Sequence, residues 1–318
     1  MILNSHFKFK LKLEDPPLRI FELPNDSKIK NFKQSSFFER LFKCFLLRYL
    51  MGKSIGVISL KGGVGKTSTA ISLGSAFAGF GKKVLLIDAN FSAPNLGLHL
   101  NIIEPEVTLH HVLRRKAHIN SAIYRVNNLD LLPSSIYQNI QIDPLKLKNY
   151  IGYLKSKYDI IIIDSSPSLN EETLAAMLAS DEILVVATPD HPTLSTTLKA
   201  IKLAKQRDVP IVGLILNKVH NKNFELTFND IENTSEVPIL AVIPNDIDFM
   251  KSLSNFSSYV DYKPNSAGSK EFYKLAATLI GEKYRPFSIK DFLMKLSPPR
   301  QEINREIFYT ELLSSPPL

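Results

Sequence analysis

Seven short runs of apolar, largely β-branched residues constrain the fold of this chain more than any other feature. The runs read SIGVISL, KVLLIDA, LDLLP, YDIIIIDSS, DEILVVATP, PIVGLILNKV and PILAVIP. Each run is continuously apolar, a pattern typical of strands that helices cover on both faces. The intervening residues have helical spacing at 66–80, 143–156, 192–207 and 266–280. The sequence therefore predicts a doubly wound α/β fold with a mostly parallel sheet.

The bulk composition excludes several protein classes. The single cysteine, Cys44, rules out an internal disulfide and a cysteine-rich metal site within one chain. No run of about 18 apolar residues occurs, and the first residues lack the pattern of a signal peptide. We therefore expect a cytoplasmic protein.

The net charge of +8 is distributed unevenly along the chain. Residues 1–50 carry +5 and residues 281–318 carry +1, which leaves +2 for residues 51–280. Proteins that bind nucleic acids usually present a strongly basic surface. The central region therefore gives no support for DNA as a partner and does not exclude it, and a local basic patch remains open.

The N-terminal extension, residues 1–50, is basic and holds 8 of the 19 phenylalanines. Its segment FFERLFKCFLLRYL, at 37–50, would place one apolar face along an amphipathic helix. Three interpretations remain open: the helix lies on a membrane surface, it packs on the central domain, or the segment precedes the true start at Met51.

The central domain is predicted to span residues 51–281, with a C-terminal extension at 282–318. This extension begins with an amphipathic segment, FSIKDFLMKL, at 287–296. A second segment carries Glu302, Glu306 and Glu311, which an anionic membrane would repel. We expect the extension to fold back on the core, with binding of a partner as the alternative.

A glycine-rich stretch, SLKGGVGKTS at residues 59–68, joins a predicted strand to a predicted helix. Its glycines let consecutive backbone N–H groups surround phosphates at a helix N-terminus. Lys66 would neutralise the β and γ phosphates, and Thr67 would coordinate Mg²⁺. The predicted nucleotide-binding residues of this loop are Gly62, Gly63, Val64, Gly65, Lys66, Thr67 and Ser68.

The same loop contains a second lysine, Lys61, and in this it resembles the deviant Walker A loop of the MinD/ParA family of P-loop ATPases. The resemblance covers residues 51–280, and DANFSAPNLGLHL is most similar to the archaeal MinD-like branch. It implies that Lys61 reaches the ATP of a partner subunit, so that two nucleotides lie between two chains. A cation that arrives only on dimerisation couples hydrolysis to dimerisation, as an arginine finger does.

Two further stretches resemble the switch segments of that family. VLLIDANFSAPNLGLHL, at 84–100, resembles switch I, and YDIIIIDSSPSLNEETLAAM, at 158–177, resembles Walker B and switch II. The resemblance implies catalytic and metal roles for Asp88 and a water-mediated Mg²⁺ contact for Asp164. Many relatives have a second aspartate where this chain has Asn90, whose amide orients water but takes no proton. We therefore expect slow hydrolysis.

Two later strand ends resemble the part of the family site that surrounds the base. ILNKV, at 215–219, contains Asn217, and the resemblance implies that its amide reads the adenine edge. VIPNDIDFM, at 242–250, contains Pro244, which the resemblance places near the base.

Taken together, the residues and the resemblance predict a slow Mg²⁺-dependent ATPase that forms an ATP-dependent homodimer. Such a switch would position or recruit cargo in cell division or spatial organisation, through an unknown protein partner bound to its switch surface. Peripheral contact with the inner face of the cell membrane remains open. The alternative is an ATP-bound dimeric scaffold with little hydrolysis, because of Asn90. His110 and His111 are interpreted as a solvated helix face and not as a metal site.

Overall fold

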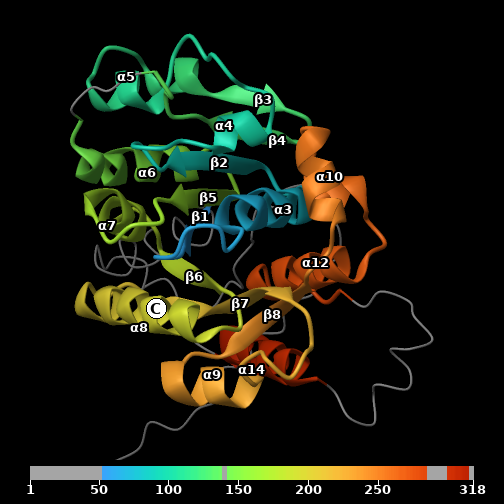
Figure 1. Ribbon diagram of the computed structural model, residues 1–318. Helices are drawn as coiled ribbons and strands as arrows, with labels where there is room; N and C mark the ends of the chain where they lie inside the picture. Colours follow the sequence, from blue (N-terminus) through green and yellow to red (C-terminus); the bar gives the residue numbers. More distant parts are fainter. Residues whose placement is uncertain (1–51, 138–141, 285–298, 315–318) are drawn as a thin grey trace, which may run out of the picture. The chain divides into compact units, whose positions relative to one another are not determined.

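The computed structural model describes residues 52–137, 142–284 and 299–314 (Figure 1). Two sequence predictions lie outside these residues: the amphipathic helix at 37–50 and the amphipathic segment at 287–296.

An eight-stranded sheet forms the centre of the described chain. Its strand order is β3-β4-β2-β5-β1-β6-β7-β8, and every neighbouring pair is parallel except β3 with β4. All seven predicted runs form strands, which confirms the doubly wound fold, whereas the short edge strand β3 was not predicted. The strands are β1 (Lys53–Ile58), β2 (Val84–Ala89), β3 (Tyr124–Val126), β4 (Leu129–Leu132), β5 (Ile160–Ser165), β6 (Glu182–Ala187), β7 (Ile211–Val219) and β8 (Ile239–Pro244).

Helices cover both faces of this sheet, and Figure 1 shows α6, α7 and α8 on one side and α3 and α12 on the other. The longer helices are α3 (Lys66–Gly79), α6 (Lys148–Lys155), α7 (Glu171–Leu178), α8 (His191–Gln206), α9 (Phe228–Ser235), α10 (Asp248–Ser254), α12 (Ala267–Leu279) and α14 (Arg300–Ser314). The shorter ones are α4 (Leu96–His99), α5 (Leu109–Leu113), η1 (Ile119–Ala122), η2 (Pro144–Leu147) and α11 (Tyr259–Tyr262).

The central strand β5 explains why the apolar runs do not alternate. Ile160 and Ile162 pack into the hydrophobic core beneath α3 and α12, whereas Ile161 and Ile163 pack into the core beneath α6, α7 and α8. Both faces of the strand are therefore buried, and a polar residue on either face would lose its water.

The strand order determines where a ligand can bind. Within the sheet, β5, β2 and β4 lie on one side of β1, whereas β6, β7 and β8 lie on its other side, so the strand order reverses at β1. In open parallel sheets, ligands bind at the carboxyl ends of the strands where the order reverses. The glycine-rich loop after β1 lies at this position.

Helix α14 packs against the edge strand β8 and against α12. The side chain of Arg305 is buried, donates to the Leu240 carbonyl at 2.7 Å, and pairs with Glu271 at 3.0 Å. Asn304 donates to the Ile239 carbonyl at 2.8 Å. Residues 299–314 thus fold back on the sheet and supply partners to carbonyl groups of an edge strand.

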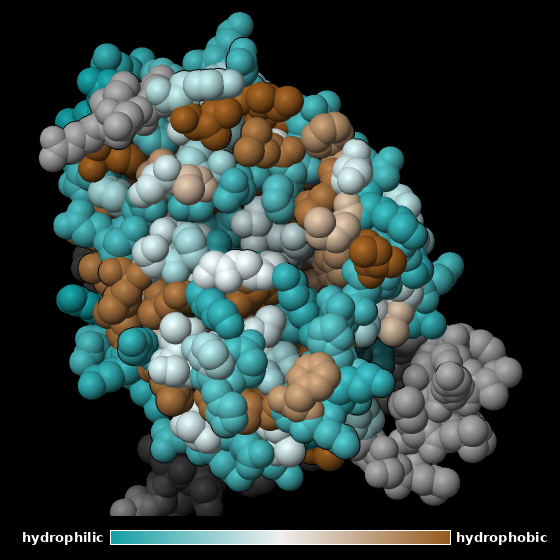
Figure 2. All heavy atoms as spheres, viewed as in Figure 1, coloured by the Kyte–Doolittle hydropathy of each residue, from teal (hydrophilic) through white to brown (hydrophobic). Residues whose placement is uncertain are grey.

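The surface of the described chain is mixed in polarity. On the face shown in Figure 2, apolar residues form separate patches among hydrophilic ones. Among the described residues, no helix combines the length and apolar character that crossing a membrane requires.

The contacts of Arg305 predict the effect of removing its side chain. Arg305→Ala would remove the nearer of the two cations that pair with the largely buried Glu271 carboxylate and leave only Lys274, at 3.7 Å, so we expect it to lower the free energy of unfolding by about 2 kcal/mol. Glu306→Ala, at an exposed position of the same helix, should change it by less than about 0.5 kcal/mol. Urea denaturation measures both, and equal effects would show that α14 contributes little through this contact.

Candidate nucleotide-binding site

A cavity of about 360 Å³ opens at the carboxyl ends of the parallel strands. Its walls include Lys61 and all of the predicted phosphate-loop residues 62–68, together with Asn90, Asn217 and Pro244. The two remaining predicted site residues, Asp88 and Asp164, lie directly behind residues of this wall. The structure thus brings all the predicted site residues to one place.

The glycine-rich loop needs its glycines for two reasons. Gly63 and Gly65 have φ angles of 78° and 89°, which favour glycine. A Cβ atom on Gly65 would also lie 2.3 Å from Nδ2 of Asn217, whereas a Cβ on Gly62 or Gly63 would meet no atom within 4 Å. The loop is therefore tightly packed on its inner side and open on the side that would hold phosphates.

Two residues at the end of β7 hold this loop from beneath. Asn217 donates from Nδ2 to the Val64 carbonyl at 2.8 Å and accepts from the Lys218 amide at 2.9 Å. Lys218 donates from Nζ to the Gly63 carbonyl at 2.7 Å. Asn217 therefore supports the loop in this structure, and its contact with adenine stays a prediction.

A charged cluster lies at the start of α3. Lys66 is buried and its Nζ lies 2.8 Å from Oδ1 of Asp164, while the Thr67 hydroxyl donates to Oδ2 of Asp164 at 2.7 Å. The Lys66 ammonium also donates to the Ser165 carbonyl. A hydroxyl and carboxylates are the hard oxygen ligands that Mg²⁺ prefers, so the donor set fits this ion.

No cluster of three or more His, Cys, Asp or Glu side chains within the described ranges could hold a metal by itself. Mg²⁺ commonly takes one or two protein ligands and completes its shell with phosphates and water.

Asp88 is fully buried beside this cluster. Its carboxylate accepts from the backbone amides of Asn90 and Leu96, at 3.1 and 3.0 Å. Burial, and then the negative charge of Asp164, raise the pKa of Asp88 to about 7, against the lowering effect of these amides and Lys66. Asp88 and Asp164 thus form an acidic pair that would bind a divalent cation favourably.

Lys61 also lines the cavity, and its side chain is about 36% exposed, so it lies at the rim. Its Nζ donates to Oδ1 of Asp190 at 3.0 Å and to the Thr193 hydroxyl at 2.7 Å. Burial raises the pKa of Asp190, but hydrogen bonds from Thr188, the Thr193 amide and Lys61 outweigh it and lower the pKa to about 2. Lys61 is therefore held at the start of α8 by a fully ionised carboxylate.

Asn90 follows β2 and is buried in the cavity wall. Its Nδ2 donates to the Ala93 carbonyl, whereas its Oδ1 has no hydrogen-bond partner among the described residues. This oxygen is sealed from solvent as well as unpaired, so the contact of Asn90 with an attacking water stays a prediction.

Comparisons with known proteins agree with this geometry. The family described as AAA domain matches residues 52–212. The septum site-determining protein MinD of Thermotoga maritima is 35% identical over 73% of this chain and 89% of its own length. The cell division ATPase MinD of Pyrococcus furiosus superposes with a TM-score of 0.68 at 36% identity, over 71% of this chain and 97% of that one. The chain belongs to the MinD/ParA family.

This MinD/ParA protein is a P-loop ATPase, with ATP as its nucleotide and Mg²⁺ as its metal. An uncharacterized ATP-binding protein of Methanocaldococcus jannaschii is 35% identical to it over 74% of this chain and 90% of the relative. MinD of Pyrococcus horikoshii, solved with Mg-ADP, superposes with a TM-score of 0.69 at 34% identity, over 72% of this chain and 96% of that one.

Several residues of this MinD/ParA site were not predicted from the sequence. Asp190 and Thr193 hold Lys61, and Lys218 holds the loop. The cavity wall also contains Asn95, His99, Asn245, Asp246, Phe249, Met250 and Leu253. The lysine pair at 61 and 66 signalled the loop, but no local pattern indicates which distant side chains contact it.

The interpretation of His110 as part of a solvated helix face is wrong. His110 is buried, its Nδ1 accepts from the Ser135 amide at 3.1 Å, and its ring packs edge-on against Phe91. Burial, with the neighbouring His111, lowers its pKa to about 4. Helix α5 presents this residue to the core because the loop from β4 covers it.

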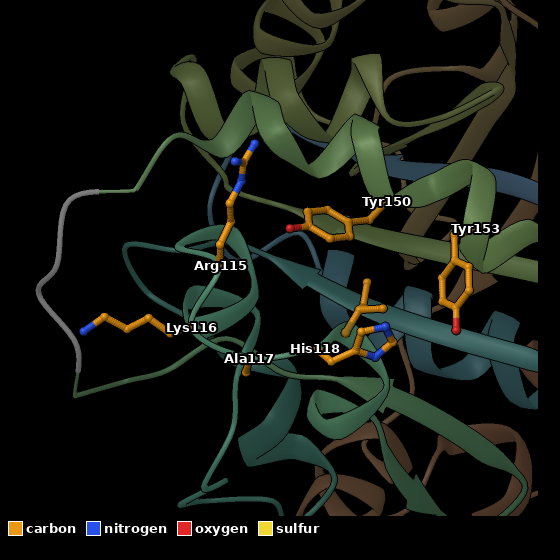
Figure 3. Close-up of a pocket in the computed structure, with 7 residues that line it drawn as sticks. Arg115, Lys116, Ala117, His118, Tyr150 and Tyr153 are labelled. Carbon is orange, nitrogen blue, oxygen red and sulfur yellow. The ribbon is translucent and has the colours of Figure 1, made fainter.

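A second cavity, of about 560 Å³, lies between the segment 115–119 and α6 (Figure 3). Figure 3 shows His118 beside Tyr153, and Arg115 beside Tyr150. None of the predicted site residues lines this cavity. The chemistry of the phosphate loop is therefore confined to the smaller cavity.

The raised pKa of Asp88 predicts that the free energy of unfolding depends on pH in the protein without nucleotide and metal. Between pH 4 and 7 the folded state holds a proton on Asp88 that the unfolded state releases, so rising pH destabilises the fold by at most about 1.4 kcal/mol per unit. Asp88→Asn removes this contribution to the pH dependence, because asparagine does not titrate. The difference in free energy of unfolding between the variant and wild type should therefore shift in favour of the variant from pH 5 to 7 and then level off.

Urea denaturation in EDTA at pH 5, 6, 7 and 8 measures this difference. Subtracting the wild type removes the opposite contribution of buried histidines such as His110, which both proteins share. A difference that is constant with pH would show that Asp88 has an ordinary pKa.

Proposed function

We propose that this ATPase forms a homodimer with two ATP molecules between its subunits, and that it works in the cytoplasm as a switch that positions or recruits a partner. The position of Lys61 carries this proposal. Its ammonium is bonded to Asp190 and Thr193 at the rim of the cavity, while Lys66 alone occupies the base of the phosphate loop. A partly exposed lysine at the rim can turn outward to a neighbouring subunit.

The residues at the base of the cavity would bind the nucleotide of their own subunit. The amides of residues 62–67 would surround the phosphates, and Lys66 would exchange its Asp164 partner for them. Thr67 and Asp164 would hold Mg²⁺, with Asp88 behind them, and bound Mg²⁺ supplies charge that neutralises the phosphates. Asn90 would orient water through its amide once its sealed Oδ1 becomes accessible.

A contact between the two switch segments supports the idea of a nucleotide-dependent surface. The Ser92 hydroxyl, in the segment after β2, donates to Glu172 at the start of α7. Leu169, in the loop before α7, is 61% exposed. A change at either segment would therefore reach the other and alter an exposed apolar residue, as switch regions do.

The relatives support the proposal that this surface acts in cell division. One solved structure from Aquifex aeolicus is a complex of the cell division proteins MinC and MinD, and it covers 74% of this chain at 25% identity. By analogy, a protein partner would bind this chain at its switch surface when ATP is bound.

Asn90 supports a second candidate function, an ATP-bound dimeric scaffold with little hydrolysis. Its amide can orient water but cannot accept a proton, and its Nδ2 is already bonded to the Ala93 carbonyl. Measurement of turnover in the dimer separates the two candidates, because the scaffold would dimerise with ATP and release no phosphate.

Two substitutions test the role assigned to Lys61. Lys61→Ala should abolish both ATP-dependent dimerisation and phosphate release, because the charge supplied to the partner's ATP is lost. Asp190→Asn keeps a residue that caps α8 but removes the charge that holds Lys61. Because an exposed ion pair contributes up to about 1 kcal/mol and each dimer would release two of them, the substitution should lower the protein concentration needed for dimerisation by up to about 30-fold.

Sedimentation velocity and phosphate release with ATP and Mg²⁺ measure these effects. Lys199→Ala, at an exposed position of α8, is the matched control and should behave as wild type. Phosphate release by a monomer that does not need Lys61 would contradict both candidate functions.

A further inference from the structure

His99 is the last residue of α4 and lines the nucleotide cavity. Its Nδ1 is sealed from solvent and has no hydrogen-bond partner among the described residues. Buried polar atoms in folded proteins are nearly always paired, so an unpaired one calls for a functional explanation.

The sealed Nδ1 decides which nitrogen of His99 carries the proton. A buried N–H without an acceptor costs more than a buried lone pair, so the proton belongs on Nε2. Burial lowers the pKa of His99, with Lys66 adding to this effect and Asp164 opposing it, so the ring is neutral near pH 7. The ring is partly exposed and lines the cavity. Because Nδ1 is sealed, we infer that the open edge of the ring is the one that carries the Nε2–H donor, and that this edge faces the cavity.

The strand order shows which end of the cavity this donor faces. His99 and Asn90 follow β2, and Pro167 follows β5, which is the neighbour of both β1 and β2. Asn217 and Pro244 come from β7 and β8, on the other side of β1. The loop that would hold the phosphates begins between the two groups, so His99 lies at the end that the base would not occupy.

This end of the cavity is poor in positive charge. The other wall residues from β2 and β5 are Asn90, Asn95 and Pro167, all of them neutral. A phosphate that extends past Lys66 toward them would find few donors to its outer oxygens. His99 offers a neutral N–H in this place.

We propose that His99 donates a hydrogen bond from Nε2 to the terminal phosphate of ATP and thereby lets this chain distinguish ATP from ADP. The inference rests on the proposed ATP site. ADP has no phosphate at this position, so His99 contributes to the binding of ATP alone. His99 would thus be a nucleotide-specificity residue within the switch I segment, 84–100, and separate from the lysines of the phosphate loop.

Three substitutions at this position test the geometry. Glutamine can place an amide N–H near the Nε2 position, asparagine reaches only the Nδ1 position, and alanine has no donor. We expect His99→Ala and His99→Asn to weaken binding of the non-hydrolysable analogue AMP-PNP about 10-fold or more, because a hydrogen bond to a charged group is lost. His99→Gln should keep most of the affinity, and all three should bind ADP within about twofold of wild type.

Calorimetric titration of the full chain with AMP-PNP or ADP, in Mg²⁺, gives the affinities. Leu98→Ala, next to His99 on α4 but outside the cavity wall, is the matched control for disturbance of the helix. Thermal unfolding without nucleotide confirms that each variant is folded.

The possible outcomes separate this inference from the proposed function. Equal loss of AMP-PNP and ADP affinity, no loss in His99→Ala, or rescue by asparagine as good as that by glutamine would each overturn the role of His99. If the wild-type protein binds neither nucleotide, or if Lys66→Ala binds both with the affinity of wild type, the proposed ATP site is wrong. A selective loss of AMP-PNP affinity that only His99→Gln avoids would support both the role of His99 and the ATP site.

Discussion

The parallel pairing of β1 with β5 is the constraint on which the site depends. In this register Val57 lies opposite Asp164, so the loop that leaves β1 passes over the carboxylate that ends β5. Lys66 and Thr67 then meet Asp164 without any further adjustment of the backbone. Buried charges are tolerated only where they are paired and hydrogen-bonded, and both conditions are met here.

The neighbouring strand β2 adds an unfavourable electrostatic interaction at the same place. Asp88 on β2 is the register partner of Asp164, so two carboxylates lie side by side in the interior. Burial and this like charge account for the raised pKa of Asp88. The fold therefore keeps an acidic pair that is unfavourable by itself and favourable with a divalent cation, which links metal binding to the stability of the sheet.

The outer parts of the site are held more weakly than its base. Lys61 is joined to Asp190 by a partly exposed ion pair, of a kind that contributes at most about 1 kcal/mol, whereas Lys66 is buried with its partner. A switch needs this difference, because one lysine must keep its place while the other changes partners. The C-terminal helix α14 lies elsewhere, on the edge of the sheet, and its contacts with β8 are structural.

The sequence by itself determined the fold class, because short, β-branched apolar runs without alternation, separated by helical stretches, are typical of strands that helices cover on both faces. It also indicated the phosphate loop, because glycines beside Lys66 and Thr67 have few other uses between a strand and a helix. The three-residue strand β3 was missed because so short a segment shows no periodicity. Only the tertiary structure decided the partner of Lys61, the pKa of Asp88 and the place of His99. These depend on contacts such as that of Lys61 with Asp190, which are 129 residues apart, and the spacing of residues along a chain carries no record of such contacts.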